Sequence, residues 1–236
     1  MLSCFGKLFT GVLNERLKKF IEVFEIVGEE QTGFRNGYST LDNLFTLYGI
    51  IDILLFKKKR LYCAFLDYEK AFDKVNRAFL WQKLISTGIT GKFLKVIVNL
   101  YEDAKSCVVG NSGERSDFFQ STVGVRQGEN LSPLLFALFL NDLKKYLSNE
   151  MSGMNTLSVE ATKANLNDSD IEVFCNLFVL LYADDTVIFS ESEAGLQKGL
   201  TLIKEYCDLW KLSLNANKCK VIVFSRGKIR KLPIFF

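Results

Sequence analysis

The stretch NLFVLLYADDTVIFSES, residues 176–192, holds two short apolar runs on either side of two adjacent carboxylates. The runs Phe178–Tyr182 and Thr186–Phe189 are rich in β-branched and aromatic residues, which favours two strands joined as a hairpin. The turn is then Ala183-Asp184-Asp185. Like charges at the end of a buried sheet repel each other, and a hard cation such as Mg²⁺ stabilises them. An ordinary polar turn is the alternative, and the hairpin taken alone favours it.

The composition of the chain excludes several kinds of catalysis. The chain has 236 residues, 48% of them hydrophobic, so it can bury the core of one large or two small domains. A net charge of +3 is too small to indicate a nucleic-acid partner without local clustering. The chain contains no histidine, which excludes Ser-His-Asp hydrolysis and H-E-x-x-H metal sites. Catalysis must therefore use carboxylates, Lys, Arg, Tyr or Cys.

The cysteines and the apolar runs indicate an intracellular protein. None of the 6 cysteines forms a C-x-x-C pair, and several lie in apolar runs. They predict buried thiols in a reducing compartment rather than disulfides or a zinc site. No apolar run reaches the ~20 residues of a membrane span, and no signal peptide is apparent. Between nucleus and cytoplasm, the localisation stays open.

Periodicity predicts the elements around the hairpin. Helices are expected over residues 2–24, Thr40–Phe56 with a cap at Ser39 or Thr40, Gly91–Tyr101 and Gly195–Leu212. In the first of these the apolar face comprises Phe5, Leu8, Phe9, Val12, Leu13, Leu17 and Phe20. Strands are expected at Leu61–Leu66, Ser106–Val109, Asp117–Ser121 and Lys218–Phe224. One further helix should follow Asp67 and carry Phe72, Val75, Phe79, Leu80 and Leu84 on its apolar face.

Three further segments contain candidate functional residues. Asp67 ends the strand Leu61–Leu66 and is a second strand-end carboxylate, although such residues often only cap a helix. The Gly-rich loop Gly28–Ser39 contains Arg35 and could close over phosphates; a plain connection between helices is the alternative. Segment Gly124–Leu143 is a loop that leads into an apolar helix. That helix should be capped by Ser132, begin at Pro133 and be buried.

The order of these segments resembles the reverse transcriptases. The matching stretches are QTGFRNGYSTLDNLF, AFLDYEKAFDKVN, GVRQGENLSPLLFALFLNDL, LLYADDTVIFSES and LSLNANKCKVIVFS, which together run from Gln31 to Ser225. They look most like the RNA-directed DNA polymerases of non-LTR (LINE-type) retrotransposons. YADD alone is moderately specific, whereas YADD with FLDYEKAFD and RQG-x-x-LSP in this order is highly specific.

The resemblance implies an α+β fold, with the fingers and palm of a right-hand polymerase, an antiparallel palm sheet backed by helices, and no thumb. It implies fingers at 1–60, palm with the first catalytic Asp at 61–104, and fingers and palm with the RQG loop at 105–147. A polar surface insertion is expected at 148–170. The palm resumes at 171–236 with the YADD hairpin, a helix and a Lys-bearing strand, cut before the primer grip and thumb.

The resemblance also implies the chemistry. Asp67, Asp184 and Asp185 would hold two Mg²⁺ ions, with Mn²⁺ as a substitute, while a primer 3′-hydroxyl attacks a dNTP. The residues expected to contact the nucleotide are Arg35, Phe72, Gln127, Gly128 and Lys218. Phe72 matches the steric gate that excludes a ribose 2′-hydroxyl. The implied partners are an RNA template, a DNA primer, dNTP and the remainder of a retrotransposon polyprotein, with its endonuclease and thumb.

Two alternatives remain. The chain could be a catalytically inactive nucleic-acid-binding remnant, as the absence of a thumb suggests, or a group II intron-like reverse transcriptase, which shares these motifs. The pair Glu129-Asn130 stands where many relatives carry Cys-Pro. That departure concerns template contact near the loop and leaves the expected metal ligands unchanged.

Overall fold

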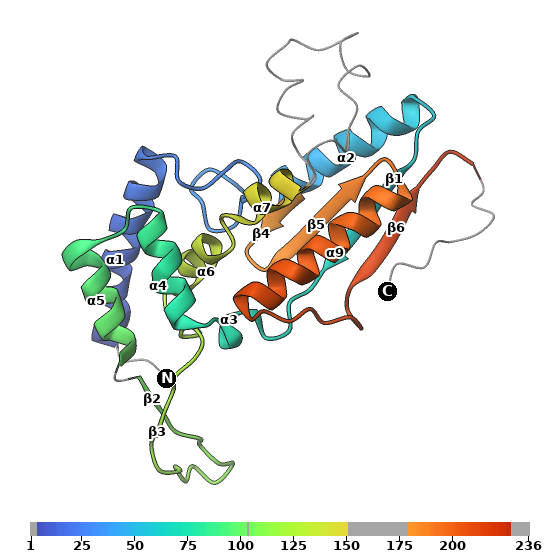
Figure 1. Ribbon diagram of the computed structural model, residues 1–236. Helices are drawn as coiled ribbons and strands as arrows, with labels where there is room; N and C mark the ends of the chain where they lie inside the picture. The colour runs from blue at the N-terminus through green and yellow to red at the C-terminus, as the bar shows by residue number, and fades with distance from the viewer. Residues whose placement is uncertain (1–3, 103, 151–178, 228–236) are drawn as a thin grey trace.

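A four-stranded antiparallel sheet forms the right-hand half of the molecule in Figure 1. The computed structural model describes residues 4–102, 104–150 and 179–227. The sheet has the order β4-β5-β1-β6, with β4 at Val179–Tyr182, β5 at Asp185–Ser190, β1 at Leu61–Leu66 and β6 at Lys220–Phe224. Strand β1 therefore lies in the interior of the sheet although it comes first in the chain, and its neighbours are the hairpin strand β5 and the late strand β6.

Helices cover both faces of this sheet. Helix α2 (Thr40–Phe56) packs Ile50 and Leu54 against one face, where they meet Leu61 and Phe189. Helix α9 (Glu193–Trp210) lies along the other face, in front of the sheet in Figure 1. Each helix begins at a serine cap: the hydroxyls of Ser39, one of the two expected caps, and of Ser192 accept backbone N–H groups of the first turn.

A second group of helices forms the left-hand half of the molecule in Figure 1. It contains α1 (Cys4–Val23), α4 (Arg77–Ser86) and α5 (Gly91–Glu102). Helix α6 (Ser132–Phe139) is almost wholly buried and joins this group to the sheet, and α7 (Leu143–Glu150) follows it. The short strands β2 (Lys105–Ser106) and β3 (Phe119–Gln120) form a protruding arm. Antiparallel sheet and helices together confirm the expected α+β class.

Lys83 connects the two halves from a buried position. Its Nζ donates to the Phe139 carbonyl at 2.7 Å, to the Tyr206 hydroxyl at 2.6 Å and to the Asp142 carboxylate, and it lies 3.8 Å from the centroid of the Trp210 ring. Its side chain is 5% exposed, and this burial lowers its pKa to about 8, although the Asp142 carboxylate acts in the opposite direction. A single ammonium thus holds α4, the α6–α7 corner and α9 together.

Several predicted elements differ from the structure in their details. The helix after Asp67 is broken into α3 (Ala71–Lys74) and α4, because the Val75 carbonyl accepts Gly124 N and Asn76 caps a new helix. Strands β2 and β3 are shorter than expected. Ser132 is the first residue of α6 and Leu131 its cap, because the Ser132 hydroxyl donates to the Arg126 carbonyl instead.

The buried side of α1 also differs from the prediction. Leu13 and Leu17 are buried as expected, but Phe5, Leu8 and Val12 are exposed. Thr10, Asn14 and Ile21 complete the buried side. The apolar residues of α1 surround too much of the helix for periodicity to say which side faces the core.

Cys63, Cys207 and Cys219 are buried thiols, as expected, whereas Cys4 is exposed. Within the described ranges, no helix has the length and apolarity needed to cross a membrane. The greater part of the predicted surface insertion, residues 151–170, lies outside the described residues, as does Phe178.

Candidate active site

Three carboxylates gather at one end of the sheet. Asp67 is the first residue after β1, and Asp185 is the first residue of β5. The antiparallel register pairs Leu66 with Thr186, so that the next step along both strands sets Asp67 opposite Asp185. Asp184 occupies the turn that precedes Asp185. Strand pairing thus brings together residues that are far apart in the sequence.

The hairpin turn is tighter than predicted. Tyr182 pairs with Asp185, which leaves Ala183 and Asp184 as a two-residue turn, and we call residues 182–185 the carboxylate turn. Ala183 has φ 60°, a left-handed conformation that costs a residue other than glycine about 1–2 kcal/mol. The fold therefore supplies contacts that hold the turn in this conformation.

The charges at this end of the sheet repel each other. The pKa of Asp185 is raised, first by desolvation and then by the negative charges of Asp184 and Asp67. On its other side Asp67 meets Lys218, whose Nζ lies 3.6 Å from its Oδ2. Lys218 belongs to the turn before β6 and not to the strand, contrary to the prediction. The order across the sheet end is thus Asp185, Asp67, Lys218.

The donor set fits a hard divalent cation. Carboxylate oxygens are the ligands that Mg²⁺ prefers, and a cation between them would offset both the desolvation and the negative charges that raise the pKa of Asp185. Among the residues that the structure describes, no three acidic or thiol side chains already converge closely enough to hold an ion. Metal binding would therefore have to draw these carboxylates closer together.

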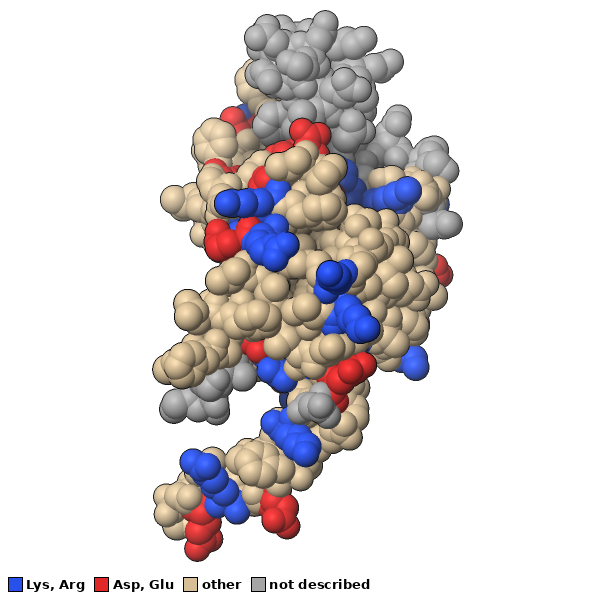
Figure 2. Space-filling view, turned by 90° about the vertical axis from the view of Figure 1, so that its left-hand side faces the viewer, with Lys and Arg blue, Asp and Glu red and all other residues tan. Residues whose placement is uncertain are grey.

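A groove of about 1110 Å³ lies between α1 and the loop before α6. Phe72, Gln127 and Gly128 all line it, so three of the predicted nucleotide-contacting residues share one cavity. Four basic side chains of α1 line its other side. They are Lys7, Arg16, Lys18 and Lys19. Figure 2 views the molecule from the side on which α1 and α5 lie, where Lys and Arg side chains are spread over a largely uncharged surface.

The positions of Phe72 and Gln127 are fixed by contacts between α3 and the loop. The Phe72 ring lies 4.9 Å from the Phe136 ring, centroid to centroid, and the Phe72 carbonyl accepts Val125 N at 2.8 Å. A Cβ on Gly124 would meet the Asp73 carbonyl oxygen at 2.6 Å, so only glycine permits this approach. The Gln127 amide donates to the Asp73 carboxylate at 2.9 Å.

Arg35 points into its own loop. Its guanidinium donates to the Gly28 carbonyl at 3.0 Å, forms ion pairs with Glu22 and Glu29, and lies 4.4 Å from the centroid of the Tyr38 ring. Its side chain is 9% exposed. In this structure Arg35 therefore organises the loop Gly28–Ser39 and does not face the groove.

Sequence reasoning missed two residues that shape the site. Arg77 donates to the carbonyls of Gly124, Tyr101, Ser121 and Val123, and so fixes the chain that leads to Gln127. Nothing in the sequence around an Arg at the start of a helix indicates this role.

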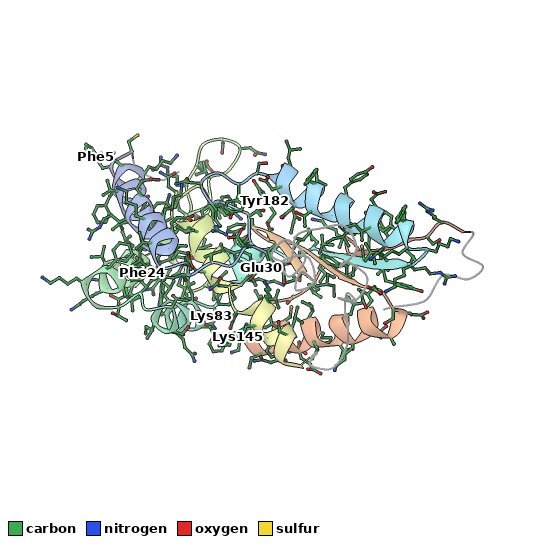
Figure 3. The ribbon with its side chains drawn as sticks, turned by 90° about the horizontal axis from the view of Figure 1, so that it is seen from above. Phe5, Phe24, Glu30, Lys83, Lys145 and Tyr182 are labelled. Atoms are coloured by element: carbon green, nitrogen blue, oxygen red, sulfur yellow. The ribbon has the colours of Figure 1, made fainter. Side chains whose placement is uncertain are left out.

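Gln31 is the second residue that shapes the site and that sequence reasoning missed. It contacts the carboxylate turn, and its neighbour Glu30 and Tyr182 of the turn both lie near the middle of the molecule in Figure 3. The only hint was its place in the QTGF stretch that carries the resemblance.

Comparison with known proteins agrees with this geometry. The family model described as "Reverse transcriptase (RNA-dependent DNA polymerase)" matches residues 1–233. The Pol polyprotein of the type-2 retrotransposable element R2DM of Drosophila melanogaster is 29% identical over 78% of this chain. The RNA-directed DNA polymerase of the mobile element jockey from Drosophila funebris is 27% identical over 99% of it. The chain spans 16% and 24% of the lengths of these two relatives.

Solved structures with the same fold include two telomerases. Telomerase of Candida tropicalis, truncated from its C-terminal domain, aligns with a TM-score of 0.63 and 18% identity over 94% of this chain and 41% of its own. Telomerase of Candida albicans gives 0.63 and 13% over 90% of this chain and 35% of its own. These likenesses confirm the right-hand polymerase fold. The chain therefore belongs to the reverse transcriptase (RNA-dependent DNA polymerase) family, as its resemblance to the polymerases of non-LTR retrotransposons predicted.

Proposed function

We propose that this chain is the part of a non-LTR retrotransposon reverse transcriptase that adds deoxynucleotides to a primer on an RNA template. The observation that supports this most directly is the register that sets Asp67 opposite Asp185, beside Asp184, in a member of this family. The sheet and α9 would belong to the palm, at 61–104 and 171–236. Residues 1–60 would be fingers, and 105–147 would contribute to both.

Asp67, Asp184 and Asp185 would hold two Mg²⁺ ions, with Mn²⁺ as a substitute. Such ions lower the pKa of an attacking hydroxyl and neutralise charge on the leaving phosphate oxygens. Asp67 is the central ligand of this proposal, because it stands between Asp185 and Lys218. On metal binding its carboxylate would exchange the ammonium of Lys218 for a cation of higher charge.

Once its ion pair with Asp67 is broken, Lys218 would interact with the incoming nucleotide. Its side chain is 67% exposed, so its ammonium is free to turn toward a triphosphate and to supply a proton to the leaving pyrophosphate. The present 3.6 Å contact with Asp67 keeps it beside the carboxylates until then. Arg35 would bind phosphate only after leaving Glu22 and Glu29, which requires movement of its loop.

The groove would hold the base and sugar of the incoming nucleotide, and the triphosphate would extend beyond its lining residues toward the carboxylates. Phe72 is half-buried against Phe136, so its ring is a firm wall where a ribose 2′-hydroxyl would clash. Gly128 has φ +82° and open space where a side chain would stand, which lets a base or sugar approach the backbone closely. Gln127 supplies an amide beside it. The Lys and Arg side chains of α1 would contact phosphates of the template.

Primer extension on an RNA template with Mg²⁺ tests this proposal. Asp184→Asn should abolish extension, with a loss of roughly 1,000-fold, because a metal contributes several kcal/mol to the transition state. Asp52→Asn is the matched control, since Asp52 is an exposed carboxylate on α2. Equal extension by the Asp184 variant would refute the metal role. Salt-sensitive binding of RNA–DNA duplex without extension would instead identify a binding module.

A further inference from the structure

The QTGF segment, residues Gln31–Phe34, runs beside the carboxylate turn as an extension of the sheet. Leu181 N donates to the Glu30 carbonyl at 2.8 Å, and Thr32 N donates to the Leu181 carbonyl at 3.1 Å. These bonds make a parallel bridge between Gln31 and Leu181. The exposed edge of β4 is thereby covered by a segment from the N-terminal part of the chain.

The Gln31 side chain continues this contact into the turn itself. Its Oε1 accepts the backbone N–H of Ala183 at 3.1 Å and that of Gly33 at 2.9 Å. Its Nε2 donates to the Ala183 carbonyl at 3.5 Å. Gln31 is 1% exposed, so these bonds are made without competition from water. One carboxamide therefore binds both the N–H and the C=O of Ala183.

Ala183 is the residue on which the direction of both turn carboxylates depends. It has φ 60° and directly precedes Asp184 and Asp185, so a change in its backbone angles would swing both side chains away from Asp67. A carboxamide suits this position because its head both donates and accepts. A carboxylate could not donate to Ala183 and would add a third negative charge to the turn.

We propose that Gln31 is a positioning residue for metal binding: its carboxamide holds Ala183 in the left-handed conformation and so aims Asp184 and Asp185 at the ion that they share with Asp67. The proposal rests on the metal site of the proposed function. Gln31 would not bind the metal itself but would orient the residues that do, through its hydrogen bonds to Ala183. The loss of such partners typically lowers metal affinity or activity 10- to 100-fold.

The test measures Mn²⁺ binding to the chain by electron paramagnetic resonance, in parallel with thermal unfolding and primer extension. Gln31→Met keeps the length of the side chain and removes its hydrogen bonds, and it should weaken Mn²⁺ binding about 10- to 100-fold. Thr32→Val is the matched control. Thr32 is equally buried and adjacent, but its hydroxyl contacts the Leu181 carbonyl and not the turn, so Mn²⁺ affinity should be unchanged.

Ala183→Gly provides the second test, because glycine adopts positive φ without a partner. In an Ala183→Gly background, Gln31→Met should weaken Mn²⁺ binding less than it does in the original chain. A role in stability alone would lower the unfolding temperature of both Gln31→Met and Thr32→Val and leave the Mn²⁺ affinity of the folded protein intact. That result, or an equal effect of Gln31→Met in both backgrounds, would overturn the proposal.

The same measurements separate this proposal from the proposed function. If the original chain binds Mn²⁺ through Asp184 but extends no primer, the polymerase proposal fails, and the Gln31 proposal stands on its binding data. If Asp184→Asn binds Mn²⁺ as well as the original chain, both proposals are overturned.

Discussion

Replacing Gly33 by alanine tests how closely the QTGF segment must approach the carboxylate turn. A Cβ at this position would lie 2.4 Å from Ala183 N, 2.9 Å from Gln31 Oε1 and 3.1 Å from Tyr182 C. Two of these neighbours are backbone atoms, so the two segments would have to separate. Separation would break the two hydrogen bonds between Gln31 and Ala183, one from Ala183 N to Gln31 Oε1 and one from Gln31 Nε2 to the Ala183 carbonyl.

The cost can be worked out from these contacts. Overpacking costs about 1–3 kcal/mol, and each lost hydrogen bond adds about 1 kcal/mol, which gives roughly 3–5 kcal/mol in all. For a chain of this size, that lowers the unfolding temperature by about 10 °C. Gly37→Ala is the control, because Gly37 has φ +82° and nothing within 4 Å. It should cost only the backbone strain of about 1–2 kcal/mol.

Thermal and urea unfolding of the two variants give the decisive comparison. The larger loss should belong to Gly33→Ala even though Gly37 has the more restrictive backbone conformation. Primer extension by Gly33→Ala, measured well below its unfolding temperature, should also fall, because the displaced turn carries Asp184 and Asp185. Equal losses of stability in the two variants would refute the close approach described here.

Three further predictions follow from other contacts. Gly49→Ala should raise the free energy of unfolding by about 0.5–1 kcal/mol in urea titration, since Gly49 lies within α2 with open space around it, and no gain would contradict that packing. Between pH 8 and 9 the free energy of unfolding should rise by about 1 kcal/mol more than it does in Lys83→Met. The pKa of Lys83 is about 8 in the folded protein and 10.5 in the unfolded chain, so the unfolded chain binds more protons in this range. Parallel curves of stability against pH for the two proteins would show that the ammonium is not desolvated. Phe72→Val should raise the incorporation of ribonucleotides relative to deoxynucleotides about 10- to 100-fold in single-nucleotide extension. Phe79 packs against Trp210, and Phe79→Val should leave this selectivity unchanged. Equal selectivity of the two variants would show that Phe72 is not the steric gate.

Local signals in the sequence predict much of the fold. Strand β1 has the predicted bounds because an uninterrupted apolar run ends abruptly at Asp67. Helix α2 has the predicted bounds because Ser39 and Asp42 form a capping box. Such signals depend on neighbours in the chain, which a sequence displays directly.

The remaining features depend on partners that are distant in sequence. The helix break at Val75 is set by Gly124, and Arg35 is drawn away from the groove by an ion pair with Glu22 of α1. Periodicity alone predicts no strand order, so it could not bring Asp67 to Asp185; the family resemblance supplied that expectation. It did not supply Gln31, whose partner Ala183 is 152 residues further along the chain.

The interior place of β1 has a consequence for biosynthesis. At ~5–20 residues per second, a ribosome takes on the order of ten seconds after completing β1 to deliver β5 and then β6. Until β5 emerges, both edges of this apolar strand lack partners, and one edge stays unpaired until β6 follows, which is the condition under which nascent chains aggregate or recruit chaperones.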